Sequence, residues 1–293
     1  MNLDKSRLKT LRVKYPDWQG GNNPVYYFGA ELLSLLLPKN TNQKEITINI
    51  QKPDNGELQI EDGITGRHII KNNIELAKQA IEKENPDKII TIGGDCLVSQ
   101  APFDYLHGKY QEQLGIIWID SHPDISNPDI FYNSHAMVLA NLLHQGDKAL
   151  SGLVNNPFKS NQILYLGLQE PTQDEKTILE KLNINYQDSR QENITHTQIS
   201  DWIAVNNFKK IAIHLDLDVL DPKAFHSLYF NDPNLTSIPD NAAVGKMGLE
   251  QLINYLVAIF NTTDVVGFSI AEYLPWDAYY LKNLFRKLAI FNE

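Results

Sequence analysis

The sequence predicts an α/β fold of three layers, in which helices cover both faces of a central, mostly parallel sheet. Two observations lead to this prediction. Short apolar segments rich in β-branched residues alternate with longer segments of helical periodicity, which is the pattern of βαβ units. With 293 residues, 42% of them hydrophobic and 21% charged, the chain can also bury one large core. We therefore expect one domain over residues 1–293.

Seven segments have the composition of strands that helices bury on both faces, as in parallel sheets. They are residues 46–50, 88–92, 115–119, 163–166, 184–187, 210–215 and 265–270. Helical periodicity favours helices at residues 67–83, 98–107, 136–143, 175–182, 199–205, 249–260 and about 278–290. The least regular region, residues 221–244, is rich in Pro, Asn and Asp and is expected to form a long surface loop.

Charge and cysteine content restrict the class of protein. The formal net charge of −10 disfavours a nucleic acid or an anionic membrane surface as partner. Cys96 is the single cysteine, so no intrachain disulfide can form and a reducing compartment fits. Residues 1–14 lack the apolar core of a signal peptide, and the apolar run at residues 32–37 is too short to cross a bilayer. We therefore expect a cytoplasmic protein.

Two short acidic motifs carry the chemistry of the chain. Asp120, His122 and Asp124 alternate directly after a predicted strand, and in an extended segment this spacing turns all three toward one face. Asp216 and Asp218 repeat that spacing after another strand. Four carboxylates that converge on one point repel each other, and a multivalent cation compensates this repulsion. The motifs therefore predict a site for a pair of divalent metal ions.

Two further strands end in polar residues of the same kind. Gly93-Gly94-Asp95-Cys96 follows the strand that ends near residue 92, and Glu272 follows the strand that ends at residue 270. Ligands of open parallel sheets bind at the carboxyl ends of the strands. Four separate strands are therefore expected to bring these residues, together with both acidic motifs, to one edge of the sheet.

In this order, the motifs resemble those of the arginase/agmatinase (ureohydrolase) superfamily. The resemblance rests on Gly93-Gly94-Asp95-Cys96, Asp120-Ser121-His122-Pro123-Asp124, His135-Ala136-Met137, the segment from Asp216 to Pro222, and Ser269-Ile270-Ala271-Glu272-Tyr273. It implies an arginase-like single domain with an eight-stranded parallel sheet, in which residues 1–45 form a divergent N-terminal segment. It also implies two manganese ions, a small guanidino or amidino substrate, and a homo-oligomer, either a trimer or a hexamer.

The resemblance further implies a role for each site residue. Asp120 and Asp216 would bridge the two ions, His122 and Asp218 would complete the shell of one ion, and Asp124 and Cys96 that of the other. A hydroxide bridging the metals would attack the guanidinium carbon and release urea, while His135 shuttles a proton to the leaving amine and Glu272 faces the guanidinium. The implied activity is that of a hydrolase acting on C–N bonds other than peptide bonds in linear amidines.

The chain departs from the family pattern at the metal site. Cys96 stands where the pattern has a metal-binding His, and a thiolate favours Zn²⁺, Fe²⁺ or Ni²⁺ over Mn²⁺. Cys96 can also be a plain buried residue, which leaves open whether it binds metal and whether both sites fill. Asp95 is expected to orient a ligand. His214 is interpreted as an ordinary surface or packing residue, together with His68, His107, His144, His196 and His226.

Departures in the substrate loops leave three functions open. The loop at residues 125–134 carries two aromatic residues and an extra acid, and Thr172 replaces the acid that receives the α-amino group of arginine. L-Arginine is therefore disfavoured, and a compound without a free α-carboxylate, of the agmatine type, fits better. The alternatives are a mononuclear zinc amidohydrolase of the deacetylase type and a catalytically decayed protein of the arginase fold that only binds.

Overall fold

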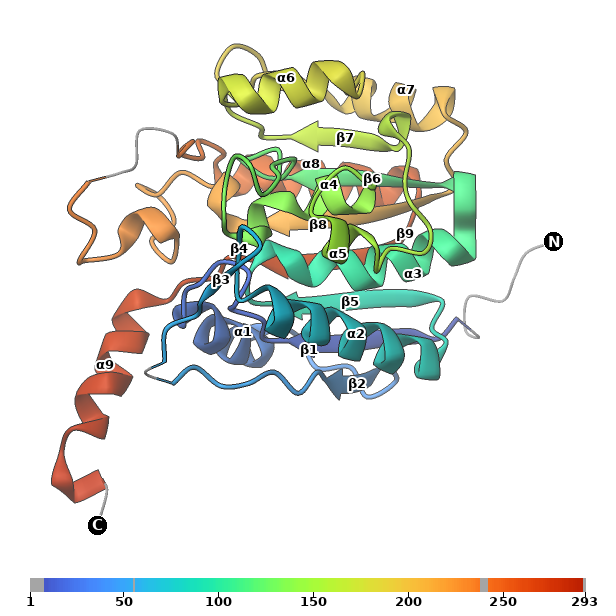
Figure 1. Ribbon diagram of the computed structural model, residues 1–293. Coiled ribbons are helices and arrows are strands. Elements are labelled where there is room, and N and C mark those ends of the chain that lie inside the picture. Colours follow the sequence, from blue (N-terminus) through green and yellow to red (C-terminus); the bar gives the residue numbers. More distant parts are fainter. Residues whose placement is uncertain (1–7, 55, 238–241, 292–293) are drawn as a thin grey trace.

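The computed structural model describes residues 8–54, 56–237 and 242–291. Its centre is a parallel sheet with the strand order β2-β1-β5-β9-β8-β6-β7 (Figure 1). The strands are β1 (Thr10–Tyr15), β2 (Lys44–Thr47), β5 (Lys88–Gly93), β6 (Leu114–Ile119), β7 (Ile163–Leu166), β8 (Lys210–Asp216) and β9 (Asp264–Ala271). A small antiparallel pair, β3 (Ile60–Glu61) and β4 (Ile64–Thr65), lies outside this sheet.

Helices cover both faces of the sheet (Figure 1). They are α1 (Val25–Leu36), α2 (Arg67–Glu84), α3 (Gln100–Tyr110), α4 (Val138–Leu142), α5 (Lys148–Ser151), α6 (Gln173–Lys181), α7 (His196–Val205), α8 (Leu249–Thr262) and α9 (Trp276–Arg286). One hydrophobic cluster holds the buried residues of α2, α3 and α4, and a second holds those of α7 and α8. The predicted three-layer α/β fold is confirmed, because each face of the sheet buries its own core.

The number of strands differs from the prediction. In the described part of the chain the central sheet has seven strands rather than about eight. Residues 184–187 do not form a strand, since the backbone N–H of Ile184 donates to Leu179 O and ends α6. The sequence prediction also missed β1, in which Arg12 and Lys14 break the apolar pattern. Arg12 is tolerated because its guanidinium donates to Pro38 O at 2.7 Å.

Loops at one end of the sheet form the region of interest. In Figure 1 the strands run from right to left, so the loops that follow β5, β6, β8 and β9 gather at the left. Residues 221–237 are irregular as predicted apart from the short 3₁₀ helix Tyr229–Asn231, and the predicted loop at 221–244 includes residues 238–241, which lie outside the described residues. No described helix is both long and apolar enough to cross a membrane. One domain over 1–293 stays a prediction.

Candidate metal centre

The register of the sheet brings the two acidic motifs level with each other. Ile119 of β6 pairs with Leu215 of β8, and each is followed by the first acid of its motif. Asp216 in turn pairs with Ala271 of β9, which precedes Glu272. The carboxyl ends of three neighbouring strands therefore present acids at the same height. This is the convergence that the sequence predicted.

Ligand atoms of these residues fall into three groups, within each of which all atoms lie within 4.8 Å of one another. The inner group is fully buried and consists of Cys96, Asp120, His214 and Asp216. The outer group consists of Asp120, His122 and Asp218, of which His122 is partly exposed. A third group joins Cys96 to His135 and Glu272. Asp120 belongs to both the inner and the outer group, as a residue that bridges two ions would.

Both acidic motifs fold into the same local turn. The backbone N–H of His122 donates to Asp120 Oδ1 at 2.6 Å, and that of Asp218 donates to Asp216 Oδ1 at 2.6 Å. The chain therefore turns after the first acid instead of continuing extended, which corrects the geometry expected from alternation. The turn still keeps His122 and Asp218 together, with His122 Nδ1 3.0 Å from Asp218 Oδ2.

Cys96 lies at the junction of the inner group and the third group. Its Sγ is 2.9 Å from Asp216 Oδ2 and 3.5 Å from Glu272 Oε1, and its side chain is buried. Burial raises the pKa of the thiol well above its ordinary value, and the surrounding carboxylates, Asp216 first, raise it further. The thiol therefore stays protonated and donates to Asp216 unless a cation takes the place of its proton.

Asp124 is buried nearby but belongs to none of the three groups. Its backbone lies in the left-handed region with φ 45°, and its Oδ2 has no hydrogen-bond partner among the described residues. Burial, and then the charge of Asp120, raises its pKa well above the ordinary value. A buried carboxylate oxygen without a partner is costly, so a ligand for it is expected. Its role as a metal ligand stays a prediction.

His135 and Glu272 form a hydrogen-bonded pair beside Cys96. His135 Nδ1 is 3.3 Å from Glu272 Oε1. Burial alone would lower the pKa of His135, but the hydrogen bond and charge of Glu272 outweigh burial and raise it. Glu272 has a left-handed backbone with φ 64°, fixed by donation from its N–H to Gly94 O at 2.8 Å. Such backbone strain often occurs at functional sites.

The loop that contains Gly20 and Gly21 also contacts residues of this site, which the sequence did not indicate. The backbone N–H of His135 donates to Gly20 O at 3.2 Å, and Asp95 Oδ2 accepts from the Gly21 N–H at 2.9 Å. Burial, and then the nearby Glu272, raises the pKa of Tyr26 of α1, whose ring lies 6.4 Å from that of His135, centroid to centroid. Asp95 therefore holds this loop and belongs to none of the ligand groups of the described residues, and its role in orienting a ligand stays a prediction.

His214, interpreted from the sequence as a surface or packing residue, lies among the candidate metal ligands. It is fully buried, its ring stacks on Trp118 with centroids 3.7 Å apart, and it belongs to the inner group. Burial lowers its pKa to about 3, so the imidazole is neutral. The sequence holds a partial signal for this position. His214 precedes Asp216 by two residues in a strand, and side chains with that spacing lie on the same face.

The residues of this edge fit divalent cations. Burial and neighbouring acids raise the pKa of Asp216 as well as that of Asp124, which means that these carboxylates cannot all be ionised together without compensation. A cation would supply this compensation, and oxygen, imidazole and thiol donors that follow three strands could bind it. The inner group would hold one ion and the outer group another, with Asp120 common to both.

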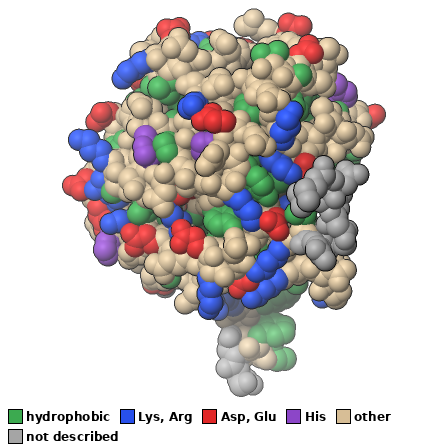
Figure 2. Space-filling model, turned by 90° about the vertical axis from the view of Figure 1, so that its right-hand side faces the viewer, with side chains coloured by type: hydrophobic (Ala, Val, Ile, Leu, Met, Phe, Trp, Pro, Cys, Tyr) green, Lys and Arg blue, Asp and Glu red, His purple; other side chains and the backbone are tan. Residues whose placement is uncertain are grey.

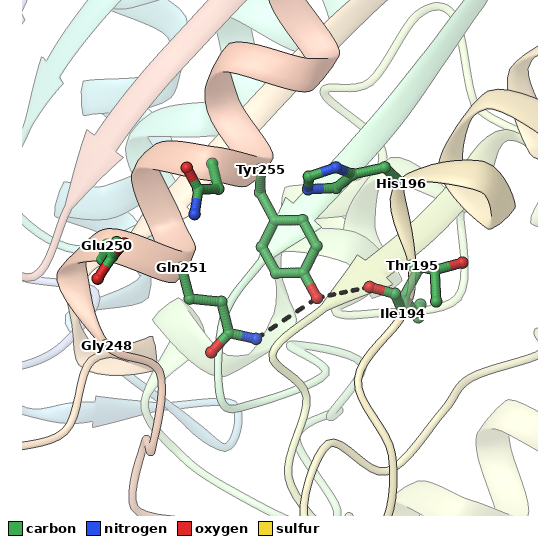
Figure 3. A pocket seen from close by; sticks show the side chains of 8 residues that line it. Ile194, Thr195, His196, Gly248, Glu250, Gln251 and Tyr255 are labelled. Atoms are coloured by element: carbon green, nitrogen blue, oxygen red, sulfur yellow. Dashed lines mark hydrogen bonds between the residues drawn. The ribbon is translucent and has the colours of Figure 1, made fainter.

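A separate surface hollow lies between α7 and α8 (Figure 3). Its lining includes His196, Glu250 and Tyr255, and Tyr255 Oη donates to Ile194 O at 2.6 Å. None of its lining residues belongs to a ligand group of the described chain. The acidic edge of the sheet, and not this hollow, is therefore the candidate functional site.

Comparison with known proteins agrees with the geometry. Residues 33–228 match a family model described as the arginase family. The chain belongs to the arginase family. An arginase of Staphylococcus aureus is 26% identical over 162 residues, which is 53% of this chain and 53% of that protein, so the chain spans about half the length of this curated relative. The predicted superfamily is confirmed, and the match begins before Gly93, where the first recognised motif starts, and ends before the segment that holds Glu272.

Solved structures of arginase-family proteins share the fold. The arginase of Entamoeba histolytica in complex with L-ornithine superposes with a TM-score of 0.76 at 18% identity, covering 91% of this chain and 92% of that one. The formimidoylglutamase of Bacillus subtilis gives a TM-score of 0.63 at 17% identity, covering 94% and 82%. At this identity the likeness shows the fold alone. Arginase-family proteins depend on a binuclear metal centre, for which the inner and outer groups are this chain's candidates.

Proposed function

We propose that this arginase-family chain is a metal-dependent hydrolase that cleaves a C–N bond in a linear guanidino or amidino compound and releases urea or a similar amide. The observation that carries the proposal is the shared position of Asp120. Two ligand groups meet at this carboxylate, and Cys96 joins the inner group to the hydrogen-bonded pair His135 and Glu272. Metal ligands and an acid–base pair thus lie within reach of one substrate carbon.

Each part of the site has a chemical task. Divalent cations bound at the two groups would lower the pKa of a water molecule and so supply hydroxide at neutral pH. Glu272 would accept charge-assisted hydrogen bonds from the guanidinium and hold its carbon beside the metal ligands. His135, whose pKa is raised above its ordinary value, keeps a proton near neutral pH that it can give to the leaving amine.

The structure supports a substrate other than L-arginine. Thr172 is the N-cap of α6, where its side chain accepts from the Glu175 N–H and its Oγ1 donates to Glu175 Oε2 at 2.8 Å. It is therefore occupied by the helix end and offers no charge to an α-amino group. Phe131 lies 6.3 Å from the ring of His135, centroid to centroid, and gives the site an apolar wall. An agmatine-type compound without an α-carboxylate fits this wall better.

A panel assay tests the proposed function. The protein is loaded in separate samples with Mn²⁺, Zn²⁺, Fe²⁺ or Ni²⁺, and urea is measured after incubation with L-arginine, agmatine and other guanidino and amidino compounds. We expect urea from at least one compound without a free α-carboxylate. The Glu272→Gln variant, which keeps the shape of the side chain, should bind metal but lose most turnover. Metal-loaded protein that releases neither urea nor a related amide from any compound would refute the proposal.

We also propose a homo-oligomer, as the resemblance implies, in the cytoplasm. In Figure 1, α9 stands away from the sheet, and it exposes a row of apolar side chains. The row comprises Leu281, Leu284 and Phe285. A second copy that covers this row would bury it. Light scattering after gel filtration should give a trimer or hexamer for the parent and a smaller species for Leu284→Glu.

A further inference from the structure

We infer that His214 is a ligand of the inner metal ion, so that this chain carries a Cys, His and carboxylate site in place of an oxygen-rich one. The inference deepens the proposed function and rests on it. His214 lies in β8, two residues before the end of the strand. In the family pattern the imidazole would instead stand at position 96. The chain would thus have moved its inner imidazole from the turn after β5 to β8.

The position of the ring supports coordination. His214 contributes a ring nitrogen that lies within 4.8 Å of the ligand atoms of Cys96, Asp120 and Asp216. The side chain is fully buried, and its Nε2 has no hydrogen-bond partner among the described residues. A buried polar nitrogen without a partner is costly, and a cation among the four ligand atoms would remove that cost.

Hydrogen bonds on the other side of the ring determine where its proton lies. Ser99 Oγ is 2.7 Å from His214 Nδ1 and 2.7 Å from Ser269 Oγ, and Ser269 Oγ is 3.5 Å from Ile213 O. A backbone carbonyl can only accept, and we assign donation along this chain from Nδ1–H through Ser99 and Ser269 to Ile213 O. The proton therefore sits on Nδ1, and Nε2 keeps its lone pair. Metal-binding histidines commonly donate their other ring nitrogen to oxygen in this way.

The orientation of the ring is fixed as well. Trp118 and His214 are partners in the register of β6 and β8, and their rings stack at an interplanar angle of 14°. The indole N–H of Trp118 donates to Asp120 Oδ2 at 3.0 Å. The two stacked rings thus lie directly below the two acids that begin the motifs. Stacking and the bond to Ser99 hold Nε2 in place without any metal, which lowers the cost of binding.

The donor set predicts which metal the inner site takes. Thiolate and imidazole are softer ligands than carboxylate, and together with two carboxylates they suit tetrahedral Zn²⁺ better than Mn²⁺. The outer group, with one imidazole and two carboxylates, lacks sulfur. We therefore expect the two sites to differ, with the inner one selecting Zn²⁺ or a similar ion.

Cadmium NMR tests the inference on the unmodified protein. The chain is labelled with ¹⁵N-histidine, loaded with ¹¹³Cd²⁺ as the probe, and examined for scalar coupling between cadmium and imidazole nitrogen. We expect two coupled imidazoles, those of His122 and His214. Cadmium uptake with a single coupled imidazole at His122 would overturn the inference and leave the proposed function standing. No uptake of any divalent cation would instead refute the proposed function.

Matched variants provide a second measurement. His214→Asn keeps a donor near Ser99 but removes the atom at the Nε2 position, and should raise the Kd for Zn²⁺ at the inner site at least about tenfold. His107→Asn is the control, because His107 is likewise a buried ring that stacks on an aromatic residue, Phe158, and has its Nδ1 hydrogen-bonded. His107→Asn should leave the Kd unchanged. Equal Kd values for the parent and His214→Asn would overturn the inference.

Discussion

The acids at the two ends of the sheet differ in whether basic side chains neutralise them. At the amino end, Asp264 begins β9 between Lys88 of β5 and Lys210 of β8, and forms an ion pair with each. Figure 2 shows this side of the molecule, where Lys and Arg side chains lie beside Asp and Glu side chains. At the carboxyl end, β8 and β9 lead into Asp216 and Glu272, which no Lys or Arg accompanies in the ion pairs of the described residues.

This difference separates acids that stabilise the fold from acids that are available to bind a ligand. Asp264 stabilises the folded protein through its ion pairs with two lysines and needs no ligand. Partial burial would raise the pKa of Asp264, but Lys210 and Lys88 outweigh burial and lower it. At the carboxyl end, burial and neighbouring acids together raise the pKa values of Asp124 and Asp216. Their uncompensated negative charge fits metal ions and the cationic guanidinium of the proposed substrate.

The largest expected effect is the loss of metal from the carboxyl end. Asp216→Asn removes the charge of an acid that lies in the inner group and begins a motif turn. We expect loss of the inner ion and a fall in turnover of about a thousandfold or more, since bound metal supplies several kcal/mol of transition-state stabilisation. Metal content by mass spectrometry and urea release measure both effects. Asp264→Asn is the control and should keep both; an equal loss in the control would break the comparison.

The next effect concerns the acid–base pair. Glu272→Gln removes the carboxylate that raises the pKa of His135, so burial should then dominate and lower that pKa. If His135 must carry a proton to serve the leaving amine, activity declines as pH rises through its pKa. The alkaline limb of the pH profile of kcat should therefore move to lower pH in the variant, with kcat reduced about a hundredfold or more. An alkaline limb that stays in place would exclude His135 as the proton donor.

A smaller effect is expected on the stability of metal-free protein. Asp124 and Asp216 have folded pKa values above the ordinary 3.8, and that of Asp120 is about 6. Groups with raised folded pKa values favour folding below their unfolded pKa and lose that contribution as pH rises through the folded pKa. Chelator-treated protein should therefore lose stability as pH rises from 3.8 through about 6 and above.

Thermal unfolding with and without Zn²⁺ measures this dependence. Bound cation should reduce the loss of stability at neutral pH, because its positive charge then neutralises the carboxylates. Asp124→Asn should stabilise the metal-free protein at neutral pH by about 1–3 kcal/mol, since it removes a buried charge whose Oδ2 has no partner. A lower free energy of unfolding in this variant would show that Asp124 is already compensated within the chain.

Motifs at strand ends allowed much of the site to be predicted from sequence, and tertiary contacts limited the rest. Asp120, His122 and Asp218 meet because β6 and β8 are neighbours in the sheet; the alternation of strands and helices indicates only that both strands end at the same edge. Tyr26 reaches Glu272 only because β1 lies next to β5 and carries α1 to that edge. Since β1 has basic residues within it, its pattern does not read as a buried strand, and so the loop it supports was missed.

The position of His214 among the candidate ligands was not predicted, for a different reason. A histidine within an apolar strand is usually a packing residue, and its spacing from Asp216 alone does not distinguish packing from coordination. The distinction depends on the free Nε2 and on the hydrogen bond from Nδ1 to Ser99, which joins β8 to the turn after β5. Such a long-range contact has no local signature in the sequence.

The smallest expected effect concerns Asp264, the acid at the amino end of the sheet. Asp264→Asn removes two partly exposed ion pairs, with Lys88 and Lys210, and should destabilise the protein by about 0.5–1 kcal/mol at neutral pH. Because the folded pKa of Asp264 is lowered, its contribution is present above the unfolded pKa and is lost as pH falls through the folded pKa. The parent and the variant should therefore converge in stability at acidic pH in urea unfolding experiments. Stabilisation by Asp264→Asn at neutral pH, the sign expected for Asp124→Asn, would mean that the two ends of the sheet do not differ in charge balance.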